Sequence, residues 1–325
     1  METNDRTRWF TPPRSVRAKA FALTLVVLVS PPSAGCGDPC AEPGRCELEV
    51  TPTPVPGEPV YGVSFLADPP LTWALKREVL QEVFVPGQFG LTEDAWYPQV
   101  TRTYYLVVWE PQPDGSYVQR ERTCSMDTSE VYVVMPNTVK AQVTVIPDRL
   151  IEHLPVDAWT FVLESAAPED FDHTTAVYAL QESEFGPQYS IWGADIQNPV
   201  QEICPPDAKA DGWVDQDEDG YPGVTTEMWI DGEFYAKTLV CQRWLHRSYP
   251  AMVTFLEDGV YRISGGMYDI VVDQSQYGTL EEPSPKLIEG QDPEVRWYPN
   301  DQTYYIMTSL PDGATCDDVT PDLFL

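Results

Sequence analysis

Basic residues are scarce in this sequence, in which 20 lysines and arginines stand against 51 aspartates and glutamates, with 3 histidines. The formal net charge of −31 excludes nucleic acid as a default partner, because phosphate binding requires a surface rich in Lys and Arg. His153, His173 and His246 lie in separate segments without the spacing of a metal-binding motif. No G-x-S-x-G elbow, P-loop or H-E-x-x-H motif occurs. The sequence therefore singles out no catalytic residue.

Long apolar runs are scarce as well, and the clearest one predicts an export signal over residues 1–35. The run F-A-L-T-L-V-V-L-V at 21–29 is too short to span a bilayer and follows a basic segment. The residues S-A-G-C at 33–36 resemble a bacterial lipobox, although Leu is preferred where Ser33 stands. This resemblance implies a lipid on Cys36 and a bacterial cell-envelope location, with the outer membrane favoured by Gly37. The Pro-rich segment that follows, 36–60, is expected to be an extended tether.

The seven cysteines agree with export. Lipidation of Cys36 would account for the odd number and leave six for three disulfides in an oxidising compartment. A zinc site is disfavoured, because no C-x-x-C spacing and no neighbouring histidine occurs. Of the pairings that six cysteines allow, we expect Cys40–Cys46, Cys124–Cys204 and Cys241–Cys316.

A run of alternating aspartates at 215–223 is the best candidate for a chemical site. Asp215, Asp217 and Asp219 can turn their carboxylates toward one centre, and calcium prefers roughly six to eight oxygen ligands. Gly220 occupies the sixth position, where the backbone must turn sharply, and Tyr221 follows with a backbone carbonyl. The pattern predicts a calcium-binding loop.

The loop is not a complete EF-hand. Thr226 stands at the twelfth position, where an EF-hand has a bidentate Glu, and Glu227 comes one residue later. Glu227, Asp211 and Glu233 are the candidates for the missing ligand. The run resembles the D-x-D-x-D-G loops of thrombospondin type 3 repeats and dockerin modules, which implies weak calcium binding in an extracellular setting. A solvated acidic turn that binds no ion is the alternative.

The remaining chain predicts an all-β, mainly antiparallel fold. Short aromatic and β-branched runs recur from residue 96 onward, and Asp-Gly pairs at 114–115, 231–232 and 258–259 mark hairpin turns. One amphipathic helix is expected at 70–85, because apolar residues such as Trp73, Leu75 and Val79 recur at three- and four-residue spacing. A short helical turn is expected at 148–154.

Two related β-barrel or sandwich domains are predicted, at 61–204 and 205–325. Pro205-Pro206 marks the boundary. The segment from Trp96-Tyr97-Pro98 to Cys124 is echoed by the segment from Trp297-Tyr298-Pro299 to Cys316, and chance similarity between aromatic hairpins is the alternative.

The export signal, the lipobox and the D-x-D-x-D-G-x-P-G loop together resemble lineage-specific lipoproteins of myxobacterial-type genomes, a family with no assigned activity. We expect a calcium-stiffened envelope protein that binds or supports a partner rather than an enzyme. The open end of a β-barrel would hold a small apolar ligand or a protein. The alternative is a carbohydrate-active hydrolase, which would need two carboxylates facing each other across a groove.

Overall fold

The computed structural model describes residues 58–60, 62–85, 95–135, 138–166, 175–180, 187–205, 211–256, 259–278, 295–297 and 303–325. The predicted export signal, Cys36, Cys40, Cys46 and nearly all of the predicted tether lie outside these residues. Within them, no helix has the length and apolar character needed to cross a membrane.

Antiparallel strands make up most of the described chain, as the all-β prediction expects. Their aromatic and β-branched residues fit the pleated, half-buried surface of a sheet. The strands are β1 (Glu58–Pro59), β2 (Thr72–Val85), β3 (Ala95–Pro111), β4 (Tyr117–Thr128), β5 (Val131–Met135), β6 (Thr138–Val145), β7 (Asp157–Ala166), β8 (Thr175–Leu180), β9 (Gln188–Trp192), β10 (Val224–Ile230), β11 (Glu233–Ser248), β12 (Ala251–Phe255), β13 (Tyr261–Gly278), β14 (Val295–Trp297) and β15 (Tyr304–Ser309). The helices are α1 (Gly62–Ala67), α2 (Asp148–His153), η3 (Cys316–Asp318) and η4 (Pro321–Phe324).

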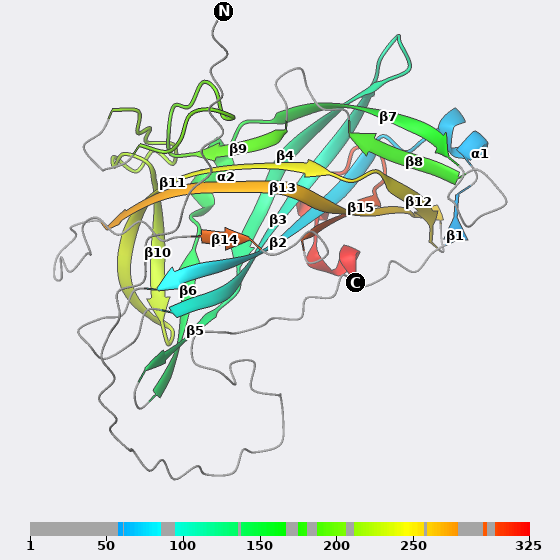
Figure 1. The fold of residues 1–325 in the computed structure, drawn as a ribbon. Helices are drawn as coiled ribbons and strands as arrows, with labels where there is room; N and C mark the ends of the chain where they lie inside the picture. The colour runs from blue at the N-terminus through cyan, green and yellow to red at the C-terminus, as the bar shows by residue number, and fades with distance from the viewer. Residues whose placement is uncertain are drawn as a thin grey trace, which may run out of the picture. The chain divides into compact units, whose positions relative to one another are not determined.

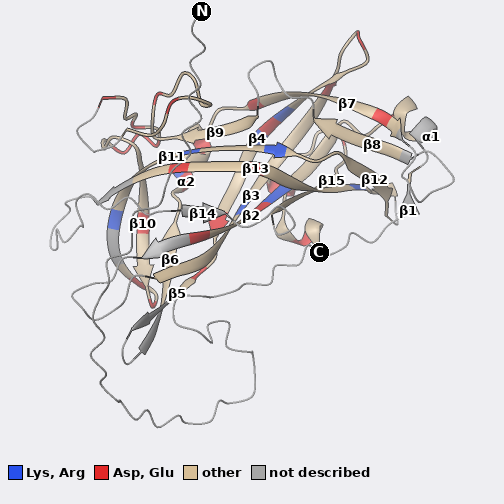
Figure 2. Ribbon diagram, viewed as in Figure 1, with Lys and Arg blue, Asp and Glu red and all other residues tan. Residues whose placement is uncertain are grey.

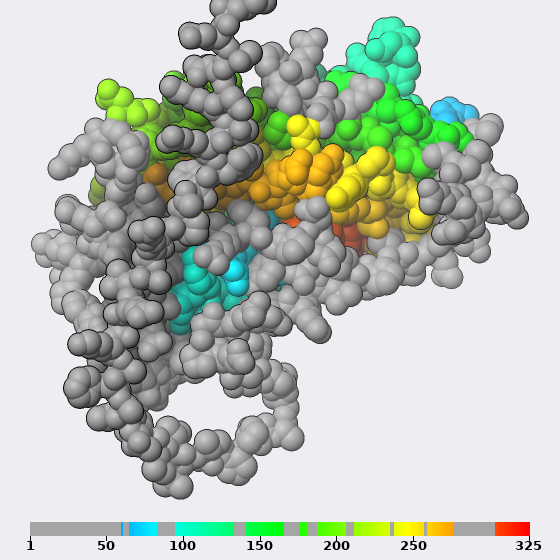
Figure 3. Space-filling model, viewed as in Figure 1, coloured from blue at the N-terminus to red at the C-terminus, as the bar shows by residue number. Residues whose placement is uncertain are grey.

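Eight of the described strands form a closed ring. The hydrogen-bonded order runs β12-β8-β7-β4-β3-β2-β15-β13, and β13 pairs back onto β12 through Val253 and Ile263. Figure 1 shows the long strands of this ring lying across one another, with α1 at one end beside β7 and β8. Side chains of β7, β8, β12 and β13 form a continuous outer surface in Figure 3. Closure of the ring leaves the paired parts of these strands without a free edge.

An aromatic core fills the ring at the α1 end. Trp109 packs against Trp73, Phe161 and Tyr178, with ring centroids 4.6, 4.5 and 5.8 Å apart. All four side chains are almost completely buried, and Phe65 of α1 covers this end of the core. Removing one such ring typically costs about 3–5 kcal/mol, so this cluster is a main source of stability.

A second layer continues from the ring through β13. The outer half of β13 pairs with β11, which pairs with β10 over one part of its length and with β9 over another. β10 in turn pairs with β6, and β6 with β5. These pairings, and those of β2 with β15 and β8 with β12, join strands on both sides of the predicted boundary at residue 205. The described strands therefore form one connected sheet.

The helix predicted at 70–85 is wrong, because this segment is the central strand β2. It pairs with β3 along its whole length and with β15 from Trp73 to Glu78. Trp73, Leu75 and Val79 face the aromatic core, while Ala74 on the opposite face packs beneath the C-terminal segment. Because both faces are buried, apolar residues occur at odd and even positions, and their spacing imitates a helix. The helical turn predicted at 148–154 is confirmed as α2.

The two predicted long-range disulfides are also paired wrongly. The structure links Cys124 with Cys316, and Cys204 with Cys241. The prediction assumed that each predicted domain holds one disulfide of its own. In the structure, the chain after β15 crosses the outer face of β2 and β3, where Phe324 packs near Tyr104. This path brings Cys316 to β4, which carries Cys124. The expected pair Cys40–Cys46 lies outside the described residues.

Candidate metal centre

The acidic loop lies between β9 and β10 and is fixed to the end of β9. Trp213 forms an antiparallel bridge with Ala194, and the Val214 amide donates to the Gly193 carbonyl at 3.0 Å. The Gly193 amide in turn donates to Gln216 Oε1 at 2.8 Å. Gly193 has a φ of +71°, and a methyl group on it would overlap the carbonyl of Val240. The loop is therefore docked closely against the neighbouring strands.

The three predicted aspartates converge. One carboxylate oxygen from each of Asp215, Asp217 and Asp219 lies within 4.8 Å of the other two. Backbone amides shape the loop, since Asp215 accepts from the Asp219 amide at 3.0 Å and from the Gly220 amide at 2.9 Å. Asp219 accepts from the Tyr221 amide at 2.9 Å. Gly220 has a φ of +93°, so the predicted sharp turn at the sixth position is confirmed.

Asp217 is the buried member of the group, with 1% of its surface exposed. One carboxylate oxygen, Oδ2, accepts a hydrogen bond from the Thr225 amide at 3.1 Å. The other, Oδ1, is buried and has no hydrogen-bond partner among the described residues. Burial raises the pKa of Asp217; the Thr225 amide opposes this, and the charges of Asp219 and Asp215 add to it. A cation would satisfy the orphaned oxygen and reverse this electrostatic cost.

Of the three candidates for the missing ligand, Glu227 is the one that shares a depression with two of the aspartates. It lines the same depression, of about 270 Å³, as Asp217 and Asp219. It does not belong to the converging group, and Trp229 Nε1 donates to its Oε2 at 3.0 Å. Lys237, opposite Glu227 on β11, also lines the depression and adds a positive charge.

The other two candidates are exposed, and neither lines this depression. Asp211 lies at the start of the loop, and Glu233 lies at the far turn of the β10–β11 hairpin, opposite Ile230. A carbonyl ligand from Tyr221 stays a prediction.

The sequence did not indicate the contribution of α2. Asp148, in the first turn of α2, lines the same depression, and His153 Nε2 at its other end lies 3.5 Å from Glu218 Oε2. α2 is more than sixty positions earlier in the chain than the loop, so no local pattern could connect them. Figure 2 shows acidic residues spread over many elements, which hides this group among ordinary surface charge.

This arrangement can hold one hard divalent cation. Carboxylate oxygens are the ligands that calcium prefers, and the buried Asp217 oxygen fits such an ion better than a solvated turn. Magnesium requires a nearly octahedral set of ligands at shorter distances and usually keeps several of its own waters, so calcium suits a cluster of carboxylates better. Comparisons of the chain with protein-family models, curated proteins and solved structures found no match.

Proposed function

We propose that this chain is an exported, lipid-anchored protein of the bacterial cell envelope, in which one calcium ion stiffens the loop at 211–223. The observation that carries this proposal is the buried oxygen of Asp217, Oδ1, which has no partner among the described residues. One oxygen of the same carboxylate lies within 4.8 Å of an oxygen of Asp215 and an oxygen of Asp219. Three close carboxylates repel one another, and a divalent ion would turn that repulsion into attraction. The protein would act as a binding or structural module.

Stiffening at this place would extend beyond the loop. The loop is hydrogen-bonded to Gly193 at the end of β9, and its last residue precedes β10 directly. The disulfide Cys204–Cys241 lies in the same region and joins the chain after β9 to β11. Disulfides are typical of oxidising compartments such as the periplasm, and this supports export.

Thermal melting with and without calcium tests the metal proposal. At about 5 mM calcium and a dissociation constant of 10⁻⁴–10⁻³ M, the ion would add about 1–2 kcal/mol to the free energy of unfolding. Asp217→Asn should abolish this gain while keeping an acceptor for the Thr225 amide. Asp68→Asn, which changes an exposed aspartate outside the loop, is the matched control and should keep the gain. An equal calcium response in the Asp217 variant would refute the site.

The lipid anchor is tested separately. Cells grown with radioactive palmitate should label the wild-type chain, and Cys36→Ala should remove the label and release the protein from the membrane fraction. Label that persists in the Cys36 variant would contradict the proposed anchor.

A carbohydrate-active hydrolase is the second candidate, and one carboxylate pair favours it. Glu121 and Asp157 are opposed on β4 and β7, and opposed residues have Cβ atoms about 4.5–5.5 Å apart. Burial, together with the charge of Glu121, raises the pKa of Asp157 to about 7, which suits a general acid. The Glu121 side chain, however, is fully buried and bound by Arg77 and Gln119, so it does not reach a substrate. Glycosidase activity that Asp157→Asn abolishes would reverse this ranking.

A further inference from the structure

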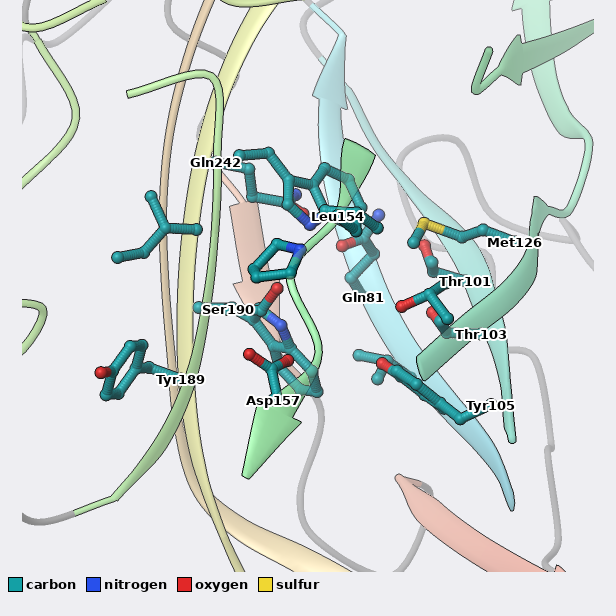
Figure 4. A pocket seen from close by; sticks show the side chains of 16 residues that line it. Gln81, Thr101, Thr103, Tyr105, Met126, Leu154, Asp157, Tyr189, Ser190 and Gln242 are labelled. Carbon is teal, nitrogen blue, oxygen red and sulfur yellow. The ribbon is translucent and has the colours of Figure 1, made fainter. Parts of the chain in front are cut away.

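A second site lies inside the molecule, where β2, β3 and β4 face β9 and β11. These elements line a partly open cavity of about 130 Å³, and the segment between α2 and β7 covers part of it. Figure 4 shows Thr101, Thr103 and Tyr105 of β3 on one side, with Ser190 of β9 and Asp157 across from them. The cavity is lined by none of the acidic-loop residues.

The cavity wall is rich in neutral hydrogen-bonding groups. Thr101, Thr103, Thr123 and Ser190 all line it, and their hydroxyls have no hydrogen-bond partner among the described residues. Thr103 and Thr123 are buried, with 8% of their surfaces exposed, so their hydroxyls face the cavity and the water within it. An apolar ligand would cover these hydroxyls without replacing the lost hydrogen bonds. The chemistry therefore differs from the apolar ligand expected from the sequence.

Apolar surface lies close to these hydroxyls. The rings of Trp192, Trp244 and Tyr105 line the cavity, together with Met126 and Leu154. Aromatic faces pack well against C–H groups, whereas hydroxyls and amides bind the polar edge of a ligand. A small ring that carries C–H groups on its face and hydroxyl groups around its edge matches this lining.

Charge narrows the class of ligand further. Among the described lining residues there is no Lys, Arg or His, so nothing at the wall neutralises an anion. Arg77 lies 4.8 Å from the centroid of the Tyr105 ring, but Glu121 pairs with it at 2.7 Å. Asp157 is the only carboxylic residue of the lining, and it makes no hydrogen bond within the described chain. A carboxyl group in this place can donate to or accept from a ligand hydroxyl.

We propose that this cavity binds an uncharged, hydroxylated molecule the size of a single six-membered ring, such as a monosaccharide or a cyclic polyol. A closed cavity of about 150 Å³ admits a benzene-sized ligand, and a monosaccharide has about twice as many heavy atoms. The cavity of about 130 Å³ is partly open, so one face of such a ring lies inside it and the outer hydroxyls stay in solvent. The threonine and serine hydroxyls bind the ligand hydroxyls, and the aromatic rings cover its C–H face.

Ligand-observed NMR and calorimetry on the full chain in calcium-saturated buffer test the proposal. The probes are glucose, galactose and myo-inositol, with glucuronate as the anionic comparison and toluene as the apolar one. At least one neutral probe should bind, and glucuronate should bind at least about tenfold more weakly than glucose because no cation faces it. Binding of toluene alone, or of none of the neutral probes, would overturn the proposal.

Two variants connect binding to the cavity. Thr103→Val keeps the side-chain shape and should weaken binding about fivefold through the loss of one hydrogen bond. Ser190→Ala makes a smaller change with the same expected direction and serves if the first variant folds poorly. Thr160→Val, on an exposed position of β7, is the matched control and should leave the affinity unchanged. If both cavity variants bind as tightly as the control, the ligand lies elsewhere and the proposal fails. Repeating the titration without calcium separates this result from the proposed metal site.

Discussion

The buried ion pair between Arg77 and Glu121 gives the sharpest prediction about stability. Arg77 Nη2 lies 2.7 Å from Glu121 Oε1, and the two side chains are 7% and 0% exposed. Gln119 donates to the same carboxylate oxygen at 2.6 Å. Gln119 Oε1 in turn accepts from Trp109 Nε1 at 2.9 Å and from the Tyr178 hydroxyl at 2.8 Å. The pair is therefore connected to the aromatic core by a chain of hydrogen bonds.

Glu121→Ala should lower the free energy of unfolding by about 3–5 kcal/mol, because it leaves the Arg77 guanidinium buried without its partner. Replacing both groups, as Arg77→Met with Glu121→Leu, should restore most of that loss, since no charge is then left buried. Urea unfolding of the two single variants and the double variant measures the coupling. Glu110→Ala breaks the exposed pair with Arg120 and is the control, with a cost of less than about 1 kcal/mol.

The reasoning fails if Glu121→Ala costs no more than the Glu110 control. It also fails if the double variant is as unstable as Glu121→Ala alone. In that case the destabilisation would come from lost packing and not from an uncompensated charge.

Three further predictions concern other parts of the chain. The pKa of Asp157 is raised to about 7 from 3.8, so the folded state keeps a proton that the unfolded chain releases from about pH 4, and the free energy of unfolding falls as the pH rises to 7. In urea titrations, Asp157→Asn should therefore be up to about 4 kcal/mol more stable than wild type at pH 8 but equal to it at pH 4. Peptide mapping without reduction should find Cys124 joined to Cys316, and replacing both with Ser should lower the free energy of unfolding by about 2–5 kcal/mol. A peptide that joins either residue to another cysteine would contradict the fold of the C-terminal segment. Gly193→Ala should lower the free energy of unfolding by at least about 2 kcal/mol, because the added methyl group overlaps a carbonyl and φ is positive, whereas Gly115→Ala, in open space at positive φ, should lower it by about 1 kcal/mol. Equal melting temperatures of the two variants would refute the close docking of the acidic loop.

The β-class of the fold could be predicted because it depends on local patterns. Asp114-Gly115 and Asp231-Gly232 lie at the turns of the hairpins β3–β4 and β10–β11, as their turn chemistry predicts. β2 could not be assigned locally, because one of its faces is buried against the aromatic core and the other beneath the C-terminal segment. The partners of Cys124 and Cys204 depend in the same way on strand order, which sequence spacing does not contain.

The two candidate sites differ in how far the sequence predicts them. Asp215, Asp217 and Asp219 are close in the chain, so their alternation was enough to place them together. Asp148 lines the same depression as Asp217 and Asp219 only because the fold brings α2 there. The cavity residues Thr103 and Ser190 come from strands more than eighty positions apart and belong to no motif, so sequence analysis had no signal for them.

Direct titration of calcium into the chelator-treated chain tests the central claim most simply. Calorimetry should find one ion per wild-type chain, with a dissociation constant of about 10⁻⁴–10⁻³ M, and no binding to Asp217→Asn. Wild-type chain that binds no calcium, or an Asp217 variant that binds it as tightly as wild type, would contradict the account.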